Sequence, residues 1–453
     1  MLYLLLCLRT QLQSRRGGHL LIFSAPLVTT AQALRSGQLD LLTYIDEICD
    51  RIGATEPLIH ALLPETDRRE RLKAEAIALQ TRFPDPSQRP PLYGIPVGVK
   101  DTFRVDGFPT RVGSQLPPEL FVGPEASCVT MLRAAGALIL GKTVTTEFAY
   151  FEPGPTRNPH NLNHTPGGSS SGSVAGVAAG FYPLAVGTQV IGSTIRPAAY
   201  CGIVGFKPSY GRIPTDGLVK CADSVEHVGY FTQDVAGSAF AAPLLCSNWR
   251  TDHTATTDSL PVLGIPEGPY IAQASAEAID AFEKQLTVLA KAGYTIRHAN
   301  AFQDIEEVNR HHTRMVFAEM AQVQEAWFAQ YEELYRPRTA AAIREGQTVG
   351  AEELAEARAG RAILRTELEA LMAEKKIDLW VCPSTTEPAP EGLASTGSPI
   401  MNLPWTYAGL PAITIPAGLA RNGLPLGLQC VGATMADEEL LAWVAPMEKL
   451  LAK

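Results

Sequence analysis

The stretch Thr165-Pro-Gly-Gly-Ser-Ser-Ser-Gly-Ser173 joins a polar loop to a segment rich in Ala, Val and Gly. The composition of residues 171–179 predicts a compact helix that begins directly after the serines. An apolar run at residues 184–187 then predicts a short strand. The same alternation extends outward, with predicted strands at residues 92–100 and 137–143 and a predicted helix at residues 128–135. Alternating strands and helices through residues 92–247 predict an α/β layered domain.

The flanking segments complete one domain rather than a row of separate domains. Residues 30–80 and about 274–374 favour helices, and strand-like runs return at residues 378–383 and 412–416. The sequence contains no internal repeat and no long low-complexity linker. We therefore expect a single domain over residues 25–453, with a helical insertion near residues 274–374.

The composition indicates a globular protein and disfavours two kinds of site. Of the 453 residues, 46% are hydrophobic and 19% are charged, which is enough apolar material for a sizeable core. The net charge of −9 disfavours a nucleic-acid-binding surface, because phosphate backbones are bound by clustered Lys and Arg. The eight cysteines show no C-x-x-C spacing, which disfavours a structural zinc site and predicts reduced thiols.

Residues 1–24 form a poorly informative amino-terminal extension. Their apolar run Met1–Leu8 is about two helical turns long, which is too short to span a bilayer. Arg9, Arg15 and Arg16 follow this run, whereas a signal peptide places its positive charge first. No other segment of the sequence has an apolar run of membrane-spanning length. We therefore expect no membrane association and a cytoplasmic location.

The serine loop by itself is compatible with several functions. Gly167 and Gly168 allow the backbone to approach a ligand closely, and the following helix directs N–H donors at the same place. An isolated Gly-Gly-Ser-Ser-Ser run is also typical of a flexible linker. A phosphate-binding loop is disfavoured because no lysine follows the glycines at the required offset. The nucleophile elbow of α/β-hydrolases is disfavoured because neither Ser171 nor Ser193 has glycines at both required positions.

Two further segments, one on each side of the loop, favour a catalytic interpretation. Val97-Gly-Val-Lys100-Asp101 precedes the loop, and Gly187-Thr-Gln-Val-Ile-Gly-Ser193-Thr-Ile-Arg196-Pro197 follows it. In this order, the three segments resemble those of the amidase signature family. The resemblance covers roughly residues 30–450 and is most specific in a signature core at residues 92–214. It extends to the flanking segments Gly141–Ala149, Cys201–Arg212 and Gly423–Gln429.

The resemblance implies a fold and a set of roles. The implied fold is a single α/β amidase-signature domain, with a large twisted mixed β-sheet flanked by helices on both faces. The family's triad implies Lys100 as the base, Ser169 in a cis peptide bond as the relay, and Ser193 as the nucleophile. The other implied site residues are Val190, Ile191, Gly192 and Ser193 as an oxyanion hole of backbone N–H groups, Ser170, Gln189 and Arg196 as supporting residues, and Thr145, Thr146 and Trp405 in the substrate pocket. No metal and no cofactor is implied.

The implied chemistry requires an uncharged lysine at position 100. A serine hydroxyl is a poor nucleophile until a base removes its proton, and an ammonium group cannot accept that proton. The pKa of Lys100 therefore has to fall from about 10.4 towards about 7. Burial among Val97, Val99 and Phe103 favours this fall, whereas Asp101 would oppose it from close range.

The chain departs from the commonest family pattern around Ser193. Gln189 replaces an aspartate, Ile191 replaces a glycine, and Arg196 lies one place later than usual, while Ser171 replaces a glycine in the serine loop. Gln189 is uncharged, so any salt bridge made by the aspartate is expected to be absent or replaced. Ile191 is β-branched and resists positive φ, so it would distort the oxyanion loop if the loop required positive φ there.

The histidines do not suggest a metal site. His311 and His312 are adjacent in a predicted helix, so their side chains project about 100° apart and do not converge on one metal ion. We expect both to be solvated or part of the core. His160 and His164 flank the serine loop, but their spacing alone does not indicate a catalytic base.

Together these features predict an amidase that hydrolyses a small carboxamide to a carboxylic acid and ammonia or an amine. A second interpretation is the A subunit of a tRNA-dependent amidotransferase, which shares the signature but usually has an aspartate at the position of Gln189. A third is a degenerate, non-catalytic family member, which the presence of all three triad residues disfavours. The expected partners are a small amide substrate and, from the frequency of twofold assemblies alone, a second copy in a homodimer.

Overall fold

The computed structural model describes residues 14–15, 18–19, 21–251 and 260–451. The apolar run Met1–Leu8 lies outside the described residues. Leu21, by contrast, is buried, and its N–H donates to the carbonyl of Pro159 at 3.1 Å. Leu21 therefore packs against the folded domain, and the boundary after residue 24 stays a prediction.

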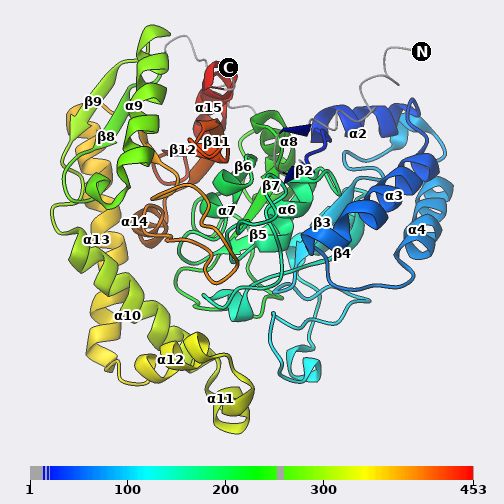
Figure 1. The fold of residues 1–453 in the computed structure, drawn as a ribbon, viewed down its shortest axis with the longest axis horizontal. Helices are drawn as coiled ribbons and strands as arrows, with labels where there is room; N and C mark the ends of the chain where they lie inside the picture. Colours follow the sequence, from blue (N-terminus) through cyan, green and yellow to red (C-terminus); the bar gives the residue numbers. More distant parts are fainter. Residues whose placement is uncertain (1–13, 16–17, 20, 252–259, 452–453) are drawn as a thin grey trace.

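A ten-stranded mixed sheet forms the centre of the protein (Figure 1). Four strand pairs are parallel (β3–β4, β3–β5, β8–β10 and β8–β9), and the other five are antiparallel. In spatial order the strands are β4 (Leu138–Thr143), β3 (Pro96–Lys100), β5 (Leu184–Gln189), β7 (His227–Thr232), β6 (Val204–Lys207), β11 (Ala412–Leu419), β12 (Pro425–Val431), β10 (Leu379–Pro383), β8 (Leu263–Pro266) and β9 (Ile296–Ala299). A separate antiparallel pair joins β1 (Ser14–Arg15) to β2 (Gly18–His19). The predicted α/β fold with a large mixed sheet is confirmed.

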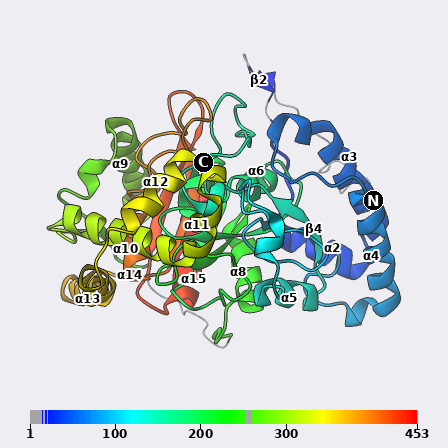
Figure 2. The same cartoon turned by 90° about the horizontal axis from the view of Figure 1, so that it is seen from below.

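Helices pack against the sheet in several groups. Helices α6 and α7 contact strands near its middle, and a second group of contacts joins α8, α9 and α15. The helices are α2 (Leu27–Ser36), α3 (Leu41–Ile59), α4 (Arg68–Arg82), α5 (Ser127–Ala134), α6 (Ser171–Ala178), α7 (Ile195–Tyr200), α8 (Val235–Leu245), α9 (Ala276–Lys291), α10 (Ile305–Val323), α11 (Glu325–Tyr331), α12 (Pro337–Gly346), α13 (Ala351–Lys375), α14 (Leu403–Ala408) and α15 (Asp437–Leu451). Figures 1 and 2 both show α2–α4 on one side of the molecule and α9–α13 on the other.

The predicted helical insertion at residues 274–374 is not helical throughout. It contains β9, which pairs in parallel with β8 at the edge of the main sheet, and α9, which packs against β10 and β12. Only the later part, α10–α13, forms a purely helical group. Strand β9 was missed because its four residues are mostly half-buried or exposed and show no clear alternation of polar and apolar side chains.

Strands β3 and β5 bring two of the predicted catalytic segments side by side. They are parallel neighbours, with Val97 opposite Leu184 and Val99 opposite Val186. Every residue of both strands is buried, as is typical of central parallel strands covered on both faces. Lys100 is the last residue of β3, and Ser193 lies in the loop that follows β5. Since ligands of open α/β sheets bind at the carboxyl ends of the strands, this is where a site is expected.

Three further observations concern membrane spans, thiols and metal ligands. Among the described residues, no helix combines the length and the apolar character needed to cross a bilayer. The described cysteines are all unpaired thiols. Within the same described part of the chain, His, Cys, Asp and Glu side chains form no group of three or more that could hold a metal ion.

Candidate active site

Lys100 directs its amine at two hydroxyl groups. Its Nζ donates to Oγ of Ser169 at 2.8 Å and to Oγ1 of Thr188 at 2.7 Å, and all three residues are buried. Ser169 lies in the loop before α6, and the Gly168–Ser169 peptide bond is cis. Thr188 belongs to β5, the parallel neighbour of β3. The fold thus brings the predicted base and relay into contact, and it adds Thr188, which the sequence reasoning missed.

The surroundings of Lys100 lower the pKa of its amine. Burial lowers this pKa to about 7, while the nearby Glu226 and Cys221 side chains act in the opposite direction. Burial has this effect because the charged ammonium loses more hydration than the neutral amine does. Asp101, the residue expected to oppose the shift, instead pairs with Nζ of Lys142 at 2.8 Å. The acidic side chain that acts on Lys100 is therefore Glu226.

Glu226 is a fully buried carboxyl group directly before β7, and the sequence reasoning missed it. One of its oxygens accepts a hydrogen bond from the Cys221 N–H at 2.9 Å. Burial raises the pKa of Glu226, and the Cys221 N–H, Lys100 and the Thr188 side chain counteract this effect. A lone acidic residue in the sequence ordinarily indicates a solvated surface. No local pattern could therefore have placed Glu226 beside Lys100.

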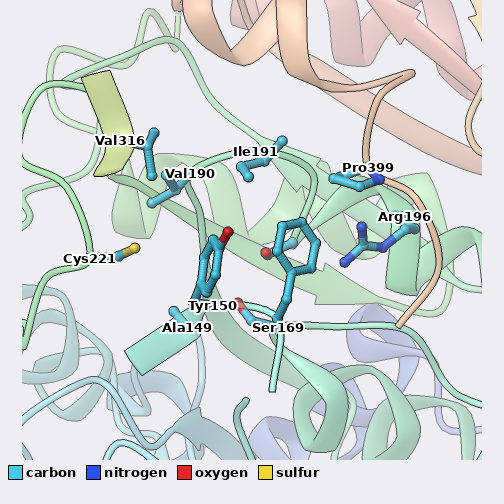
Figure 3. A pocket seen from close by; sticks show the side chains of 11 residues that line it. Ala149, Tyr150, Ser169, Val190, Ile191, Arg196, Cys221, Val316 and Pro399 are labelled. Carbon is cyan, nitrogen blue, oxygen red and sulfur yellow. The ribbon is translucent and has the colours of Figure 1, made fainter. Parts of the chain in front are cut away.

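Ser169 and Ser193 line the same narrow pocket (Figure 3). In the described part of the chain, no hydrogen bond links Ser169 Oγ directly to Ser193 Oγ. The space left in the pocket is about 10 Å³, close to the volume needed by one water molecule. Figure 3 shows the side chain of Tyr150 reaching into the space between Val190 and Ser169. The remaining lining residues are Ala149, Phe151, Ile191, Arg196, Cys221, Val316 and Pro399.

The loop of residues 190–193 directs its carbonyl and N–H groups to opposite sides. Its first three carbonyl oxygens each accept a hydrogen bond. The Val190 carbonyl accepts from His312 Nε2 at 2.9 Å, and the Ile191 carbonyl accepts from Thr406 Oγ1 at 2.7 Å. The Gly192 carbonyl accepts from the Arg196 N–H at 3.0 Å. The C=O and the following N–H of a planar trans peptide point in opposite directions. The N–H groups of residues 191–193 therefore point away from these donors, and among the described residues they have no acceptor.

The structure shows what replaces the family's aspartate at Gln189 and whether Ile191 distorts the loop. Gln189 Oε1 accepts the N–H groups of Thr194 at 2.7 Å and Ile195 at 3.0 Å, and its Nε2 donates to Thr406 Oγ1 at 2.9 Å. The neutral amide thus replaces a carboxylate as an acceptor at the start of α7 and adds a donor that a carboxylate lacks. Ile191 does not adopt positive φ, so its β-branched side chain does not strain the loop.

Ser170 and Arg196 support the serine loop. Ser170 Oγ donates to the Thr188 carbonyl at 3.3 Å, and Arg196 Nη2 donates to the Gly168 carbonyl at 2.7 Å and to Thr396 Oγ1 at 3.1 Å. Burial lowers the pKa of Arg196 to about 10, which leaves the guanidinium charged at neutral pH. Its Nε and Nη1 have no hydrogen-bond partner in the described part of the chain, and the residue lines the pocket. A buried cation with unused donors therefore faces the pocket.

Comparison with known proteins identifies the family of this fold and site. The family model described as Amidase matches residues 43–441. The chain belongs to the amidase family. This membership confirms the resemblance that was based on the segments around Lys100, Ser169 and Ser193.

Curated relatives and solved structures of the amidase family match nearly the whole chain. The A subunit of glutamyl-tRNA(Gln) amidotransferase from Roseiflexus castenholzii is 30% identical, with 91% of this chain and 94% of the relative covered. The protein of the same name from Synechococcus sp. (strain WH7803) is 32% identical over the same shares of the two chains. A crystal structure of an amidase superposes with a TM-score of 0.83 and 30% identity, covering 94% of this chain and 100% of the other.

Trp405 is a core residue of this amidase-family chain. Trp405 belongs to α14, and its side chain is fully buried. Its Nε1 donates to the Tyr270 hydroxyl at 2.8 Å, and the centroid of its ring lies 4.9 Å from that of Phe302. Trp405 is not among the lining residues of the described pocket, and its predicted contact with substrate stays a prediction. The large ring contributes to the aromatic core between the sheet and the helical layer.

Thr145 and Thr146 lie against the serine loop rather than in the pocket. Thr145 Oγ1 donates to the Thr146 carbonyl at 3.1 Å, and the Thr146 N–H donates to the Ser169 carbonyl at 3.2 Å. Both residues are buried, and neither is among the lining residues of the described pocket. Thr146 therefore holds the backbone of Ser169, and the predicted contact of both threonines with substrate stays a prediction.

The pocket is closed instead by aromatic residues that the sequence reasoning missed. Tyr150 and Phe151 follow the 3₁₀ turn Glu147–Ala149, and the centroids of their rings lie 4.7 Å apart. The ring of Tyr150 also packs edge-to-face against Phe317 of α10, at 5.7 Å between centroids. Two adjacent aromatic residues shortly after Thr145 and Thr146 were the feature of the sequence that could have predicted this closure. An adjoining hollow of about 770 Å³ shares Tyr150, Phe151 and Pro399 with the pocket and is bordered by α10 and α12. Both helices belong to the region near residues 274–374 that was predicted as a helical insertion.

Proposed function

We propose that the protein is an amidase that hydrolyses a small carboxamide through an ester formed on Ser193. The single observation that supports this most directly is the 2.8 Å hydrogen bond between Lys100 and Ser169, in a buried cluster beside the pocket that Ser193 lines. In this proposal, Lys100 is the base, Ser169 is the relay and Ser193 is the nucleophile.

The proposed reaction begins with neutral Lys100. The amine accepts the proton of Ser169 while Ser169 accepts the proton of Ser193, and Ser193 Oγ forms a bond to the carbonyl carbon of the substrate. The C–N bond then breaks, and the proton returns through Ser169 to the departing nitrogen, which leaves as ammonia or an amine. Water attacks the ester in the same manner and releases the carboxylic acid. The pKa of about 7 supports this role, because much of the lysine is then uncharged at neutral pH.

The free N–H groups of residues 191–193 are proposed to bind the oxyanion of the tetrahedral intermediate. Donors that are already oriented need no rearrangement during the reaction, and loss of one such donor typically costs about 2.7–4 kcal/mol. Gly192 is suited to this loop because a Cβ there would lie 2.4 Å from Oδ1 of Asn402. A larger residue there would have to displace either the Asn402 side chain or the loop that carries the donors.

The substrate is proposed to be a linear amide whose remainder extends into the adjoining hollow. The catalytic pocket itself has room for little more than the reacting group unless Tyr150 and Phe151 move. The unused Nε and Nη1 of Arg196 provide a positive site for an oxygen of the substrate. Urea-type amides have the same C–N bond next to a carbonyl and belong to the same candidate class.

A fluorophosphonate probe tests the nucleophile, and a panel of amides tests the substrate class. We expect mass spectrometry to find the label on Ser193 and no labelling of Ser193→Ala. Acid release is then measured for propionamide, benzamide, glycinamide, N-methylbenzamide and biuret. A folded protein that is not labelled and hydrolyses none of these compounds would favour the degenerate, non-catalytic alternative.

A second candidate function is supported by the curated relatives, each of which is named as the A subunit of glutamyl-tRNA(Gln) amidotransferase. In this alternative, Ser193 would attack glutamine and the released ammonia would pass to a partner protein. Co-expression with candidate tRNA-binding partners, followed by co-purification and a glutaminase assay, separates the two functions. Hydrolysis of the amide panel by the isolated chain, without glutaminase activity, would support the first. The expected homodimer stays a prediction that size-exclusion chromatography with light scattering can check.

A further inference from the structure

Helix α10 brings a histidine to the loop that precedes Ser193. Nε2 of His312 lies 2.9 Å from the carbonyl oxygen of Val190, and the side chain is fully buried. The neighbouring ring is that of Tyr407, at 5.8 Å between centroids in an edge-to-face arrangement. Arg361 is the charged side chain that acts on His312. The two adjacent histidines of the sequence thus differ, because only one of them reaches the site.

The hydrogen-bond partner determines which nitrogen of His312 is protonated. A carbonyl oxygen only accepts, so Nε2 must be the N–H of the ring. Nδ1 has no partner in the described part of the chain, so no contact stabilises a second proton. Burial lowers the pKa of His312 to about 4, with Arg361 acting in the same direction and the bond to Val190 opposing it. The imidazole is therefore neutral at physiological pH and acts only as a donor.

We propose that His312 is a positioning residue that holds the Val190–Ile191 peptide so that the Ile191 N–H is available to the oxyanion. The inference rests on the proposed function and assigns a role to a residue of the helical region outside the signature core. Because C=O and N–H are opposed across the planar peptide, the bond from Nε2 to Val190 fixes the direction of the Ile191 N–H. Rotation of this peptide would exchange the two groups and replace a donor with a carbonyl oxygen.

The next two peptides of the loop are held differently, which isolates the effect of His312. The Ile191 carbonyl is bound by Thr406 of α14, and the Gly192 carbonyl is bound by the N–H of Arg196. Thr406 is in turn hydrogen-bonded by Gln189 at 2.9 Å. Loss of the His312 donor therefore affects the first peptide of the loop and leaves the bonds to the second and third in place.

The test compares His312→Phe, His312→Gln and the matched control His311→Phe. Phenylalanine retains a planar ring without a donor, whereas the amide of glutamine can place an N–H near the position of Nε2. His311 is adjacent on α10 but interacts with Glu307 at 3.0 Å, away from the loop. The readouts are the second-order rate of fluorophosphonate labelling of Ser193 and the kcat and KM for p-nitrophenyl acetate hydrolysis.

We expect His312→Phe to lower the labelling rate and kcat about 10- to 100-fold with little change in KM, as expected when a donor to the oxyanion is misplaced. His312→Gln should stay within about 5-fold of the wild type, and His311→Phe should be unchanged. Wild-type rates in folded His312→Phe would overturn the inference. Equal losses in folded His312→Phe and His312→Gln would also overturn it, since the ring rather than the donor would then matter.

A measurement on the wild type decides the matter if His312→Phe does not fold. Long-range ¹H–¹⁵N NMR, assigned by the resonances absent in His312→Gln, should show a neutral imidazole protonated at Nε2 at pH 6. A ring protonated at Nδ1, or a doubly protonated ring at that pH, would overturn the inference. The proposed function has its own readout: a wild-type protein that is not labelled at Ser193 would overturn both, whereas labelling that His312→Phe does not slow overturns only the role of His312.

Discussion

Two lysines of this protein, Lys100 and Lys207, have similar burial and different partners. Both are fully buried, and burial lowers the pKa of each to about 7. Lys207 Nζ donates to the carbonyls of Leu410 at 2.6 Å and Pro208 at 3.2 Å. Lys100 Nζ instead contacts the hydroxyls of Ser169 and Thr188.

The difference shows that a lowered pKa alone does not make a lysine a catalytic base. A backbone carbonyl has no proton to give, so neutral Lys207 would find nothing to deprotonate. A hydroxyl both donates and accepts, so it can pass a proton from a nucleophile to an amine. Burial provides the uncharged amine at both sites, but only at Lys100 does the partner connect it to a pocket.

The largest expected effect is that of replacing the amine of Lys100. We expect Lys100→Met to lower kcat by at least about 10³-fold, because removing one member of a catalytic unit disables the rest. Steady-state kinetics on the best substrate of the amide panel provide the measurement. Turnover within 10-fold of the wild type would show that Lys100 is not the base, and that its difference from Lys207 does not matter for catalysis.

The second effect concerns the relay hydroxyl. Ser169→Ala leaves the amine of Lys100 in place but breaks its connection to Ser193, so we expect kcat to fall about 10²- to 10⁴-fold. Fluorophosphonate labelling should slow in parallel, since the same deprotonation is required. Ser173→Ala is the control, because that buried hydroxyl contacts Thr143 and not Lys100. Equal effects of the two substitutions would contradict a relay role for Ser169.

The third effect is a change in pH dependence. The acid limb of kcat/KM should follow the pKa of Lys100, since only the neutral amine is active. Glu226 raises this pKa, so Glu226→Gln should move the limb to lower pH. At an effective dielectric constant of about 20, one charge about 6 to 12 Å away corresponds to a displacement of about one to two pH units. A limb that moves upward, or does not move, would exclude Glu226 as a charge acting on Lys100.

The smallest expected effect on rate is that of Lys207. Lys207→Met should leave kcat within about 3-fold of the wild type and leave the acid limb unmoved. It should lower the free energy of unfolding by about 1–3 kcal/mol, because the buried carbonyl of Leu410 loses its donor. Urea denaturation and a pH–rate profile on the same preparation provide the two measurements. A large loss of kcat in a stable Lys207→Met protein would remove the distinction between the two lysines.

Much of the fold and the central part of the site could be predicted from local patterns. The short apolar runs that end at Lys100 and before Ser193 predicted β3 and β5, and the glycine-serine run predicted the loop and helix α6. By contrast, the burial of Trp405 in the core could not be predicted, because an aromatic residue near a pocket segment and one inside the core look the same in sequence. Strand β9 was missed because a four-residue edge strand has too few positions to show a period.

The sequence by itself determined the identities and order of the proposed catalytic residues, because glycines, serines and a lysine at characteristic spacing lie within short segments whose local conformation they specify. Tertiary structure alone decided what surrounds them. Glu226 beside Lys100 and His312 at the Val190 carbonyl come from segments far away in the chain. Burial and long-range packing set the pKa values and orient the peptides, and these depend on which distant elements meet, a property that no local spacing encodes.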